Sequence, residues 1–308
     1  MTNITAAQVK ELREKTGAGM LDSKKALEAT NANMEEAIDW LRKKGLASAA
    51  KKASRIAAEG LVSILVEGNK GAVAEVNSET DFVAKNEIFQ EYVADAAIIA
   101  LKCNGSVDDM KSFVCNKAQK PFGERLTDMI AKIGENMNLR RACTVEVSEG
   151  VVSSYLHNAI NPQIGKIGVL VALESKADKT KLAELGKKIA MHIAASNPLF
   201  LTTKDVDTKS LERERAIFAE QAKASGKPEN IIEKMVDGRI KKYFDEVVLE
   251  EQSFIMDPDK RVKDIIAATA KELGSEIALT NFILFKLGEG IEKKEEDFAA
   301  EVAAQLAQ

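Results

Sequence analysis

Few residues in this sequence have a type and spacing that could carry out chemistry. There are two histidines, His157 and His192, and three cysteines, Cys103, Cys115 and Cys143, which form no CxxC pair. These residues do not fit a zinc site or a disulfide framework. The chain also lacks a GxxxxGK[ST] phosphate loop, an HExxH helix and a GxSxG elbow. We therefore expect no metal, no cofactor and no covalent catalysis.

The segment best suited to binding a partner surrounds Asp81 and Phe82. It lies where a predicted strand gives way to a predicted helix, a position that offers side chains outward. Phe82 would supply apolar area and Asp81 a charge that redirects hydrogen bonds, as a wedge in a partner protein requires. The alternative is that Phe82 fills the core beneath the helix, as most aromatic side chains do.

Two rounds of strand, loop, strand and helix are predicted around this segment. Residues 61–76 form the first pair of strands and residues 88–102 the helix that follows, while 151–173 and 179–195 repeat the order. A hairpin followed by a helix favours antiparallel pairing. The sequence therefore predicts an α+β fold whose core has two similar subdomains, each an antiparallel sheet with a helix.

Three short helices are predicted before the first strand. Thr5 with Gln8 and Asn33 with Glu36 fit capping boxes, and Gly45 suits the end of the third helix. So short a stretch buries little surface, which indicates a small module attached to a larger core. Residues 46–59 are rich in Ala, Lys and Ser and are expected to form a helical or partly flexible connector.

The last hundred residues are predicted to leave the core and return to it. Residues 205–251 are highly charged and are broken at 225–228, which is typical of two antiparallel helices. Such a hairpin is either an interaction device or a solvated lobe. A helix at 262–273 and a strand at 279–287 follow, and residues 291–308 fit an amphipathic helix.

The composition limits where the protein works. Its net charge of −4 gives no global attraction to nucleic acid. No apolar run approaches the about 20 residues that span a bilayer, and the N-terminus lacks a signal-peptide pattern. We expect a cytoplasmic protein that contacts neither a membrane nor, directly, nucleic acid.

Several motifs follow one another in a fixed order along essentially the whole chain. They are Thr16-Gly17-Ala18-Gly19-Met20 with Lys24-Lys25-Ala26-Leu27, Glu75-Val76-Asn77 with Thr80-Asp81-Phe82-Val83-Ala84, Lys132-Ile133-Gly134-Glu135-Asn136, Ser154-Tyr155 with His157, Ala190-Met191-His192-Ile193-Ala194-Ala195, Ser225-Gly226-Lys227-Pro228 and Gly288-Glu289-Gly290-Ile291-Glu292-Lys293. Together they resemble the elongation factor Ts family.

The resemblance implies a guanine nucleotide exchange factor that binds elongation factor Tu with GDP and promotes GDP release by disturbing Mg²⁺ and phosphate binding in that partner. It implies no covalent catalysis. A homodimer, or a heterotetramer with the partner, is the assembly that the family suggests. The residues that would disturb Mg²⁺ in the partner are Thr80, Asp81, Phe82 and Val83, and the other expected contacts are Lys24, Ile133, Gly134, His157, Ile255 and Met256.

The resemblance also implies a division into modules. These are a three-helix, ubiquitin-associated-like domain at 1–54, a core N-subdomain at 55–140, a core C-subdomain at 141–199 that resumes at 254–289, a helical hairpin at 200–253 that dimerises or protrudes, and a C-terminal module at 290–308.

Some features leave other interpretations open. Ser253 stands where the family usually has proline, Leu284 where arginine is common, and the loop at 158–163 is longer than usual. His157 and the Ile133-Gly134 pair could be structural, and His192 is expected to be a packing residue without a site role. Two rival functions are an adaptor that binds through its N-terminal module and an enzyme that uses scattered carboxylates.

Overall fold

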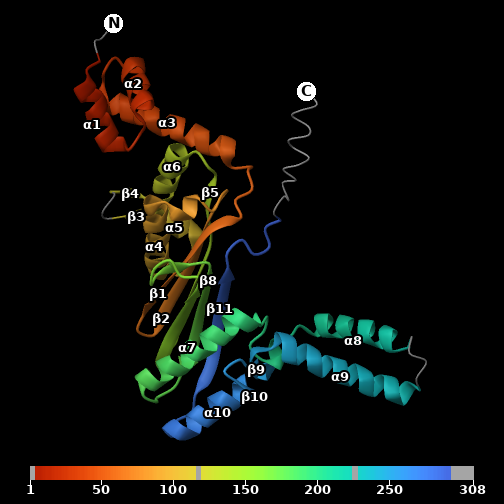
Figure 1. The fold of residues 1–308 in the computed structure, drawn as a ribbon. Coiled ribbons are helices and arrows are strands. Elements are labelled where there is room, and N and C mark those ends of the chain that lie inside the picture. Colours follow the sequence, from red (N-terminus) through yellow and green to blue (C-terminus); the bar gives the residue numbers. More distant parts are fainter. Residues whose placement is uncertain (1–3, 116–118, 224–227, 293–308) are drawn as a thin grey trace.

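Two antiparallel sheets packed face to face form the centre of the protein (Figure 1). The computed structural model describes residues 4–115, 119–223 and 228–292 and shows a mixed α+β fold. The first sheet has the strand order β5-β2-β1-β7 and the second β11-β8-β6. The strands are β1 (Glu59–Glu67), β2 (Lys70–Ser78), β5 (Met137–Glu146), β6 (Gly150–His157), β7 (Ile164–Gly165), β8 (Ile167–Glu174) and β11 (Ala278–Lys286).

Both faces of each sheet are buried, which explains the continuous apolar runs in the sequence. Along β8, Leu170 and Ala172 face an inner cluster between the sheets, while Val169 and Leu173 face an outer cluster beneath helices. Side chains alternate between the faces of a strand, so both sets must be apolar when both faces are covered. The antiparallel pairing predicted for β1 with β2 and for β6 with β8 is confirmed.

Glycines allow the two sheets to approach each other closely. A Cβ at Gly71 of β2 would lie 2.8 Å from a methyl carbon of Val152, and one at Gly168 of β8 would lie 2.7 Å from Val62. A larger side chain at either position would push the sheets apart. The short strand β7 joins the sheets further, because it follows β6 in the chain yet pairs with β1.

Helices cover the outer face of each sheet. The first carries α4 (Glu87–Lys102), α5 (Val107–Ser112) and α6 (Phe122–Ile133), with Tyr92 and Phe122 stacked at 4.0 Å between ring centroids. The second carries α7 (Lys179–Ser196) and α10 (Val262–Leu273). The sequence patterns predicted no element between 103 and 149, where the structure has α5, α6, β5 and the short pair β3 (Val114–Cys115) and β4 (Lys120–Pro121).

The N-terminal helices are α1 (Ala6–Thr16), α2 (Met20–Ala29) and α3 (Met34–Lys52), and they enclose a small apolar cluster of their own. The capping box of Thr5 with Gln8 is confirmed. Asn33 caps α3 as expected, but its partner differs. The carboxylate of Glu36 accepts from the side-chain amide of Asn33, while the backbone N–H of Asn33 donates to Thr30.

The prediction that Gly45 ends the third helix is wrong. The helix continues to Lys52, and Gly45 is buried in its interior, where a Cβ would lie 3.7 Å from that of Ala131 in α6. The alanines and lysines after Gly45 are strong helix formers and carry the helix onward. Gly45 therefore lies inside the helix where α3 faces α6 and does not end it, and the expected connector is largely the end of α3.

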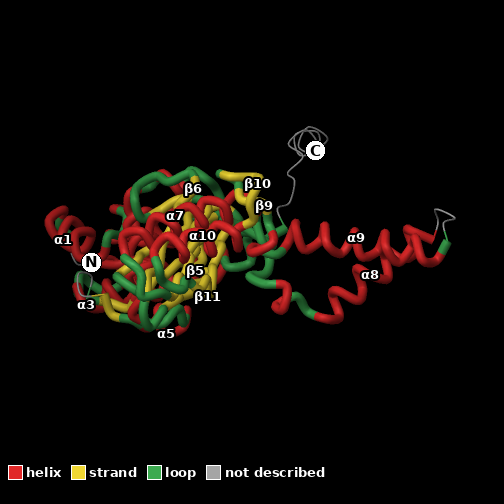
Figure 2. Tube along the Cα trace, turned by 90° about the horizontal axis from the view of Figure 1, so that it is seen from below, coloured by secondary structure: helices red, strands yellow, loops and turns green. Residues whose placement is uncertain are grey.

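Two long helices extend away from the sheets, as Figures 1 and 2 show. They are α8 (Thr208–Lys223) and α9 (Glu229–Val247), linked by an ion pair of 2.6 Å between Arg215 and Asp237. The predicted break at 225–228 lies mostly outside the described residues, as does the predicted terminal helix beyond residue 292. Between α9 and α10 lie β9 (Ser253–Phe254) and β10 (Asp257–Arg261). Within the described ranges, every helix is too short or too polar to cross a bilayer.

Candidate functional site

Residues 80–83, hereafter the 80–83 segment, connect the end of β2 to α4. The last residue of the segment begins a short 3₁₀ helix, η1 (Val83–Lys85), whose Val83 and Ala84 side chains are buried in the core of the first sheet. Asn86 then caps α4 by accepting from the backbone N–H groups of Ile88 and Phe89. The segment is therefore held at its far end by apolar packing and by a helix cap.

Phe82 is exposed over 74% of its surface, so the interpretation that it fills the core is wrong. Val83 and Ala84 occupy that place, and the tight turn directs Asp81 and Phe82 outward. The Lys85 ammonium lies 5.3 Å from the centroid of the Phe82 ring and 4.0 Å from the Asp81 carboxylate. Asp81 and Phe82 form the exposed tip of this turn. The tip presents an aromatic ring flanked by the exposed acid Asp81 and the exposed base Lys85.

The base of the tip is bonded to the segment that follows α6. The Glu135 carboxylate accepts from the Thr80 backbone N–H at 3.0 Å and from the Thr80 hydroxyl at 2.7 Å. In return, the Glu79 carboxylate accepts the backbone N–H of Asn136. The Ser78 hydroxyl donates to the carbonyl of Thr80 at 2.9 Å. Thr80 is therefore half-buried and faces its own chain, which the sequence patterns had not indicated.

These bonds bring Ile133 and Gly134 next to the 80–83 segment. Gly134 ends α6 in the left-handed conformation at φ 91°, directly before Glu135. Ile133 is half-buried against the core of the first sheet, while Gly134 is exposed. Two sets of predicted contact residues, 50 positions apart at their closest in the sequence, thus lie on adjoining surfaces.

Ile255 and Met256 form a second exposed position, on the turn between β9 and β10. His192 of α7 is buried beneath this turn and accepts the Ile255 backbone N–H on Nδ1 at 3.3 Å. A backbone N–H can only donate, so Nδ1 carries no proton and Nε2–H donates to Gln252 at 2.9 Å. Burial lowers the pKa of His192, although the bond to Gln252 acts in the opposite direction.

The expectation that His192 is a satisfied packing residue agrees with this geometry, yet the residue also orients the turn that carries Ile255. Gln252 was not singled out from the sequence. Its amide donates to the carbonyl of Glu246 at 2.7 Å and so ties the turn to the end of α9. The motif at 190–195 drew attention to His192, but Gln252 lies 60 residues away and was found only in the structure.

His157 and Lys24 lie on other elements. His157 is exposed at the end of β6, and its Nδ1 lies 3.2 Å from the Tyr155 hydroxyl. The following loop is ordered by Asn161, whose side chain accepts from the backbone N–H groups of Gln163 and Ile164. Lys24 is exposed on α2 and lies 3.7 Å from Glu28.

Ser253 and Leu284, which depart from the usual family pattern, lie in different surroundings. Ser253 is exposed at the start of β9, beside the buried Phe254. Leu284 pairs with Val169 across β11 and β8 and packs against the outer cluster of the second sheet. A leucine suits that apolar contact.

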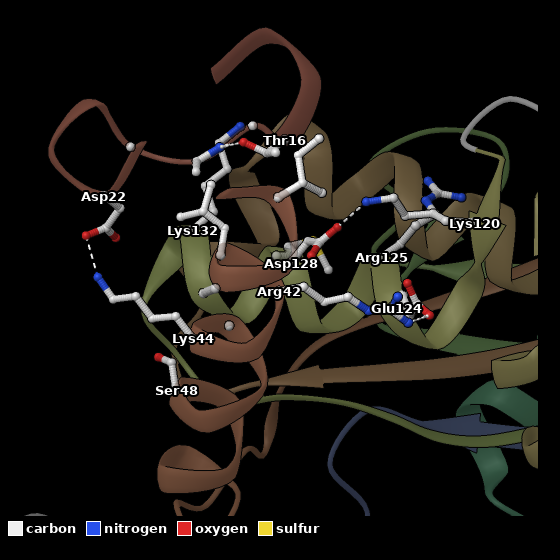
Figure 3. A pocket seen from close by; sticks show the side chains of 18 of the residues that line it. Thr16, Asp22, Arg42, Lys44, Ser48, Lys120, Glu124, Arg125, Asp128 and Lys132 are labelled. Atoms are coloured by element: carbon white, nitrogen blue, oxygen red, sulfur yellow. Dashed lines mark hydrogen bonds and ion pairs between the residues drawn. The ribbon is translucent and has the colours of Figure 1, made fainter. Parts of the chain in front are cut away.

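A cleft of about 550 Å³ lies between the N-terminal helices and α6 (Figure 3). Its charged side chains largely pair with one another: Arg42 with Glu124, Lys44 with Asp22, and Lys120 with Asp128. The first of these pairs joins α3 to α6. The cleft is therefore a joint between module and core.

Glu75 has the most deeply buried ion pairs of the described residues. Burial would raise its pKa, but the Gly288 N–H and the guanidinium groups of Arg141 and Arg140 outweigh burial and hold the pKa below its ordinary value. Its oxygens also contact Asn77. A carboxylate with these partners links β2, β5 and the end of β11.

Comparisons with known proteins agree on one family. The family profile described as Elongation factor TS matches residues 79–289. The chain is 57% identical over 305 residues to the elongation factor Ts of Paramagnetospirillum magneticum, covering 99% of this chain and 98% of that protein. It is 55% identical to that of Rhodospirillum rubrum, with 99% of each covered, and 53% identical to that of Bartonella henselae, with 98% of each covered.

Matches of this extent carry more weight than any single motif, because they run through the N-terminal helices, both sheets and the hairpin. On this sequence and this fold, the chain belongs to the elongation factor Ts family, the nucleotide exchange factors of elongation factor Tu in translation elongation.

Proposed function

We propose that the 80–83 segment is the part of this chain that acts on the nucleotide site of elongation factor Tu, with Phe82 as the wedge and Asp81 as the charge beside it. The observation that carries this proposal is the 74% exposure of Phe82 at a turn whose next two residues are buried. An aromatic ring exposed on a rigid support can enter a partner without a large loss of conformational entropy.

The physical basis of exchange is reciprocal coupling. A protein that binds a GTPase more tightly without nucleotide than with it must weaken nucleotide binding by the same factor. The nucleotide is held by Mg²⁺ and by fixed charges and dipoles around its phosphates. A wedge that displaces the metal ion, or the backbone beside it, removes several of these interactions at once. This chain's residues bind and displace, and no covalent step is involved.

The remaining contacts are proposed at separate places on the surface. Ile133 and Gly134 adjoin the 80–83 segment, and Ile255 with Met256 forms an exposed apolar turn. His157 and Lys24 are exposed on β6 and α2. Contacts on several elements would fix the orientation of the partner, which the wedge requires.

The proposed modules are a ubiquitin-associated-like domain at 1–54, core subdomains at 55–140 and at 141–199 with 254–289, the hairpin at 200–253 and a C-terminal module at 290–308. Two glycines support similar subdomains. Gly60 and Gly150 stand near the start of β1 and β6 with φ of 124° and 144°. A Cβ at either would overlap the carbonyl oxygen of the strand opposite, at Val76 and Leu173.

We propose that the hairpin supports a homodimer or a heterotetramer with the partner, and that the protein works in the cytoplasm.

The test is the release of a fluorescent GDP analogue from elongation factor Tu, measured at several concentrations of this protein. Phe82→Ala is expected to lower the maximal release rate about 10- to 30-fold, because a central aromatic anchor is lost. Val114→Ala is the matched control, since Val114 is also an exposed apolar residue of the first subdomain but lies on β3. Equal release by Phe82→Ala and wild type would defeat the wedge assignment.

The charge is tested separately. Asp81→Asn keeps the shape of the side chain and is expected to slow release about threefold to tenfold, as loss of a charged contact does. Asp108→Asn is its control, because Asp108 is exposed and also lies 4.0 Å from a lysine, Lys111. Equal effects of the two changes would mean that only general electrostatic attraction had been altered.

A further inference from the structure

Two glutamates connect the 80–83 segment and the end of α6 reciprocally. Glu135 accepts both the backbone N–H and the hydroxyl of Thr80, at 3.0 and 2.7 Å. Glu79, the residue before Thr80, accepts the backbone N–H of Asn136, the residue after Glu135. Each segment thus supplies one carboxylate and donates hydrogen bonds to the carboxylate of the other. We call Glu79, Thr80, Glu135 and Asn136 the carboxylate clamp.

We infer that the carboxylate clamp positions Phe82 for exchange, with Glu135 acting through Thr80 as a positioning residue that does not itself contact the partner's nucleotide site. This inference rests on the proposed role of Phe82 as the wedge. It also changes the role of Thr80, whose N–H and hydroxyl are both directed to Glu135 and not outward.

The location of the clamp supports positioning over a general stabilising role. Val83 and Ala84 are buried, and Asn86 caps α4, so the chain after Phe82 is fixed without the clamp. Before Phe82, β2 ends at Ser78. Residues 79–82 between these anchors are held by the clamp and by the bond from the Ser78 hydroxyl to the Thr80 carbonyl. Hydrogen bonds to an ionised carboxylate are shorter and stronger than neutral ones, which suits them to hold an exposed loop.

The clamp also reaches the chain that leads out of the N-terminal module. The Asn136 side-chain amide donates to the carbonyl of Arg55 at 2.7 Å, and the Arg55 guanidinium lies 3.5 Å from Glu79. Arg55 follows α3 by three residues. Preorganisation of the tip therefore uses groups from three segments of the chain, around 55, 79–80 and 135–136.

The position of Phe82 should affect the release of GDP that follows binding to elongation factor Tu. The contacts proposed at Lys24, His157, Ile255 and Met256 lie on other elements and do not depend on the clamp. Affinity for the complex of elongation factor Tu with GDP should therefore persist, while a less firmly positioned Phe82 displaces the partner's groups less effectively. The effect should therefore appear in the maximal rate of release and not in the concentration that gives half of it.

The experiment measures release of fluorescent GDP from elongation factor Tu over a range of concentrations of each full-length variant. Thr80→Val removes the hydroxyl at nearly constant shape, and Glu135→Gln replaces one acceptor oxygen with a donor. Each is expected to lower kcat about tenfold with KM changed less than about twofold. Thr80→Ser restores the hydroxyl and should recover most of kcat. The double variant should lose less than the two single losses combined, because both single changes affect the bond between the Thr80 hydroxyl and Glu135.

The chain contains a matched control for the same chemistry elsewhere. Asp205 accepts the backbone N–H and the hydroxyl of Thr202, both at 2.8 Å, at the base of the hairpin. Thr202→Val therefore removes an equivalent hydrogen bond away from the tip. It should leave kcat near the wild-type value. If it slowed release as much as Thr80→Val does, the effect would be one of general stability, and the inference would be overturned.

Failure of the clamp and failure of the wedge are distinguishable in the same assay. If Phe82→Ala slows release while Thr80→Val and Glu135→Gln do not, the wedge stands and the clamp is wrong. If Phe82→Ala releases GDP at the wild-type rate, positioning of Phe82 is irrelevant and both fail. A loss confined to KM, or one that Thr80→Ser does not recover, also overturns the inference.

Discussion

The Oε1 atom of Glu75 accepts the backbone N–H of Gly288 at 2.9 Å, a bond between residues 213 positions apart. The same carboxylate meets Arg140 at 2.9 Å and Arg141 at 2.6 Å. Arg141 in turn lies 4.2 Å from the centroid of the Phe285 ring. The buried charge of Glu75 thus ties the end of β11 to the first sheet.

Glu75→Gln is expected to destabilise the protein by about 2–3 kcal/mol, because the partly buried Arg140 loses its counter-charge and Arg141 keeps only the more exposed Glu289. Urea unfolding followed by circular dichroism measures this. Glu146→Gln is the control: Glu146 also lies on the first sheet, but it is 59% exposed and 3.6 Å from Lys70. Its loss should cost under about 1 kcal/mol. Similar costs for the two variants would show that the Glu75 network contributes no more than a surface pair.

Gly288→Ala is expected to destabilise more than an ordinary substitution of a left-handed glycine. Gly288 has φ 71°, and a Cβ there would overlap the carbonyl oxygen of Ala58. Gly68 has φ 63° with open space around its Cβ position. We expect about 1 kcal/mol for Gly68→Ala from backbone strain alone and more than about 2 kcal/mol for Gly288→Ala. Equal values would mean that the segment around Gly288 moves freely.

Gly45→Ala is expected to stabilise the N-terminal module by about 0.5–1 kcal/mol. Glycine in a helix interior is less favourable than alanine by about that amount. The added Cβ would lie 3.7 Å from that of Ala131, an ordinary contact distance. Trp40, the single tryptophan of the chain, lies on the same helix, so its fluorescence reports unfolding of this module. A lower unfolding midpoint would show that α3 and α6 pack too closely for a methyl group.

The stability of the protein should fall as the pH drops below about 6.5, because of His192. Its pKa in the folded state is lowered by burial from an ordinary value of 6.5. Between the folded pKa and 6.5 the unfolded chain binds more protons, so stability is present above this window and is lost on acidification through it, by up to about 1.4 kcal/mol per pH unit. Protonation would also place an N–H on Nδ1, opposite the N–H of Ile255.

Thermal unfolding of wild type and His192→Gln at pH 7.5, 6.5 and 5.5 measures this effect. The wild-type midpoint should decrease over that range more steeply than that of the variant, since glutamine does not titrate. His157 is present in both proteins and cancels in the comparison. Parallel decreases would show that His192 does not link folding to pH.

Local patterns of the sequence determined most of the elements. The cap formed by Thr5 and Gln8, the apolar runs of β1 and β8, and the helix Val262–Leu273 each depend on residues close together in the sequence. Helix periods, caps and short apolar runs are set by these near neighbours, which is why they could be predicted. The motif that contains Asp81 and Phe82, and with it the family, is likewise a property of the linear sequence.

Tertiary structure decided which of those elements meet and which of their side chains are exposed. The short strand β7 follows β6 in the chain but pairs with β1 of the other sheet, which no local pattern indicated. Phe82 is exposed because Val83 and Ala84 fill the adjoining part of the core. Thr80 is held because Glu135 lies within hydrogen-bonding distance of it. Such relationships depend on which distant segments meet, and neither composition nor period encodes them. The sequence by itself determined the family and the tip, while only the fold decided that the tip faces solvent on a fixed base.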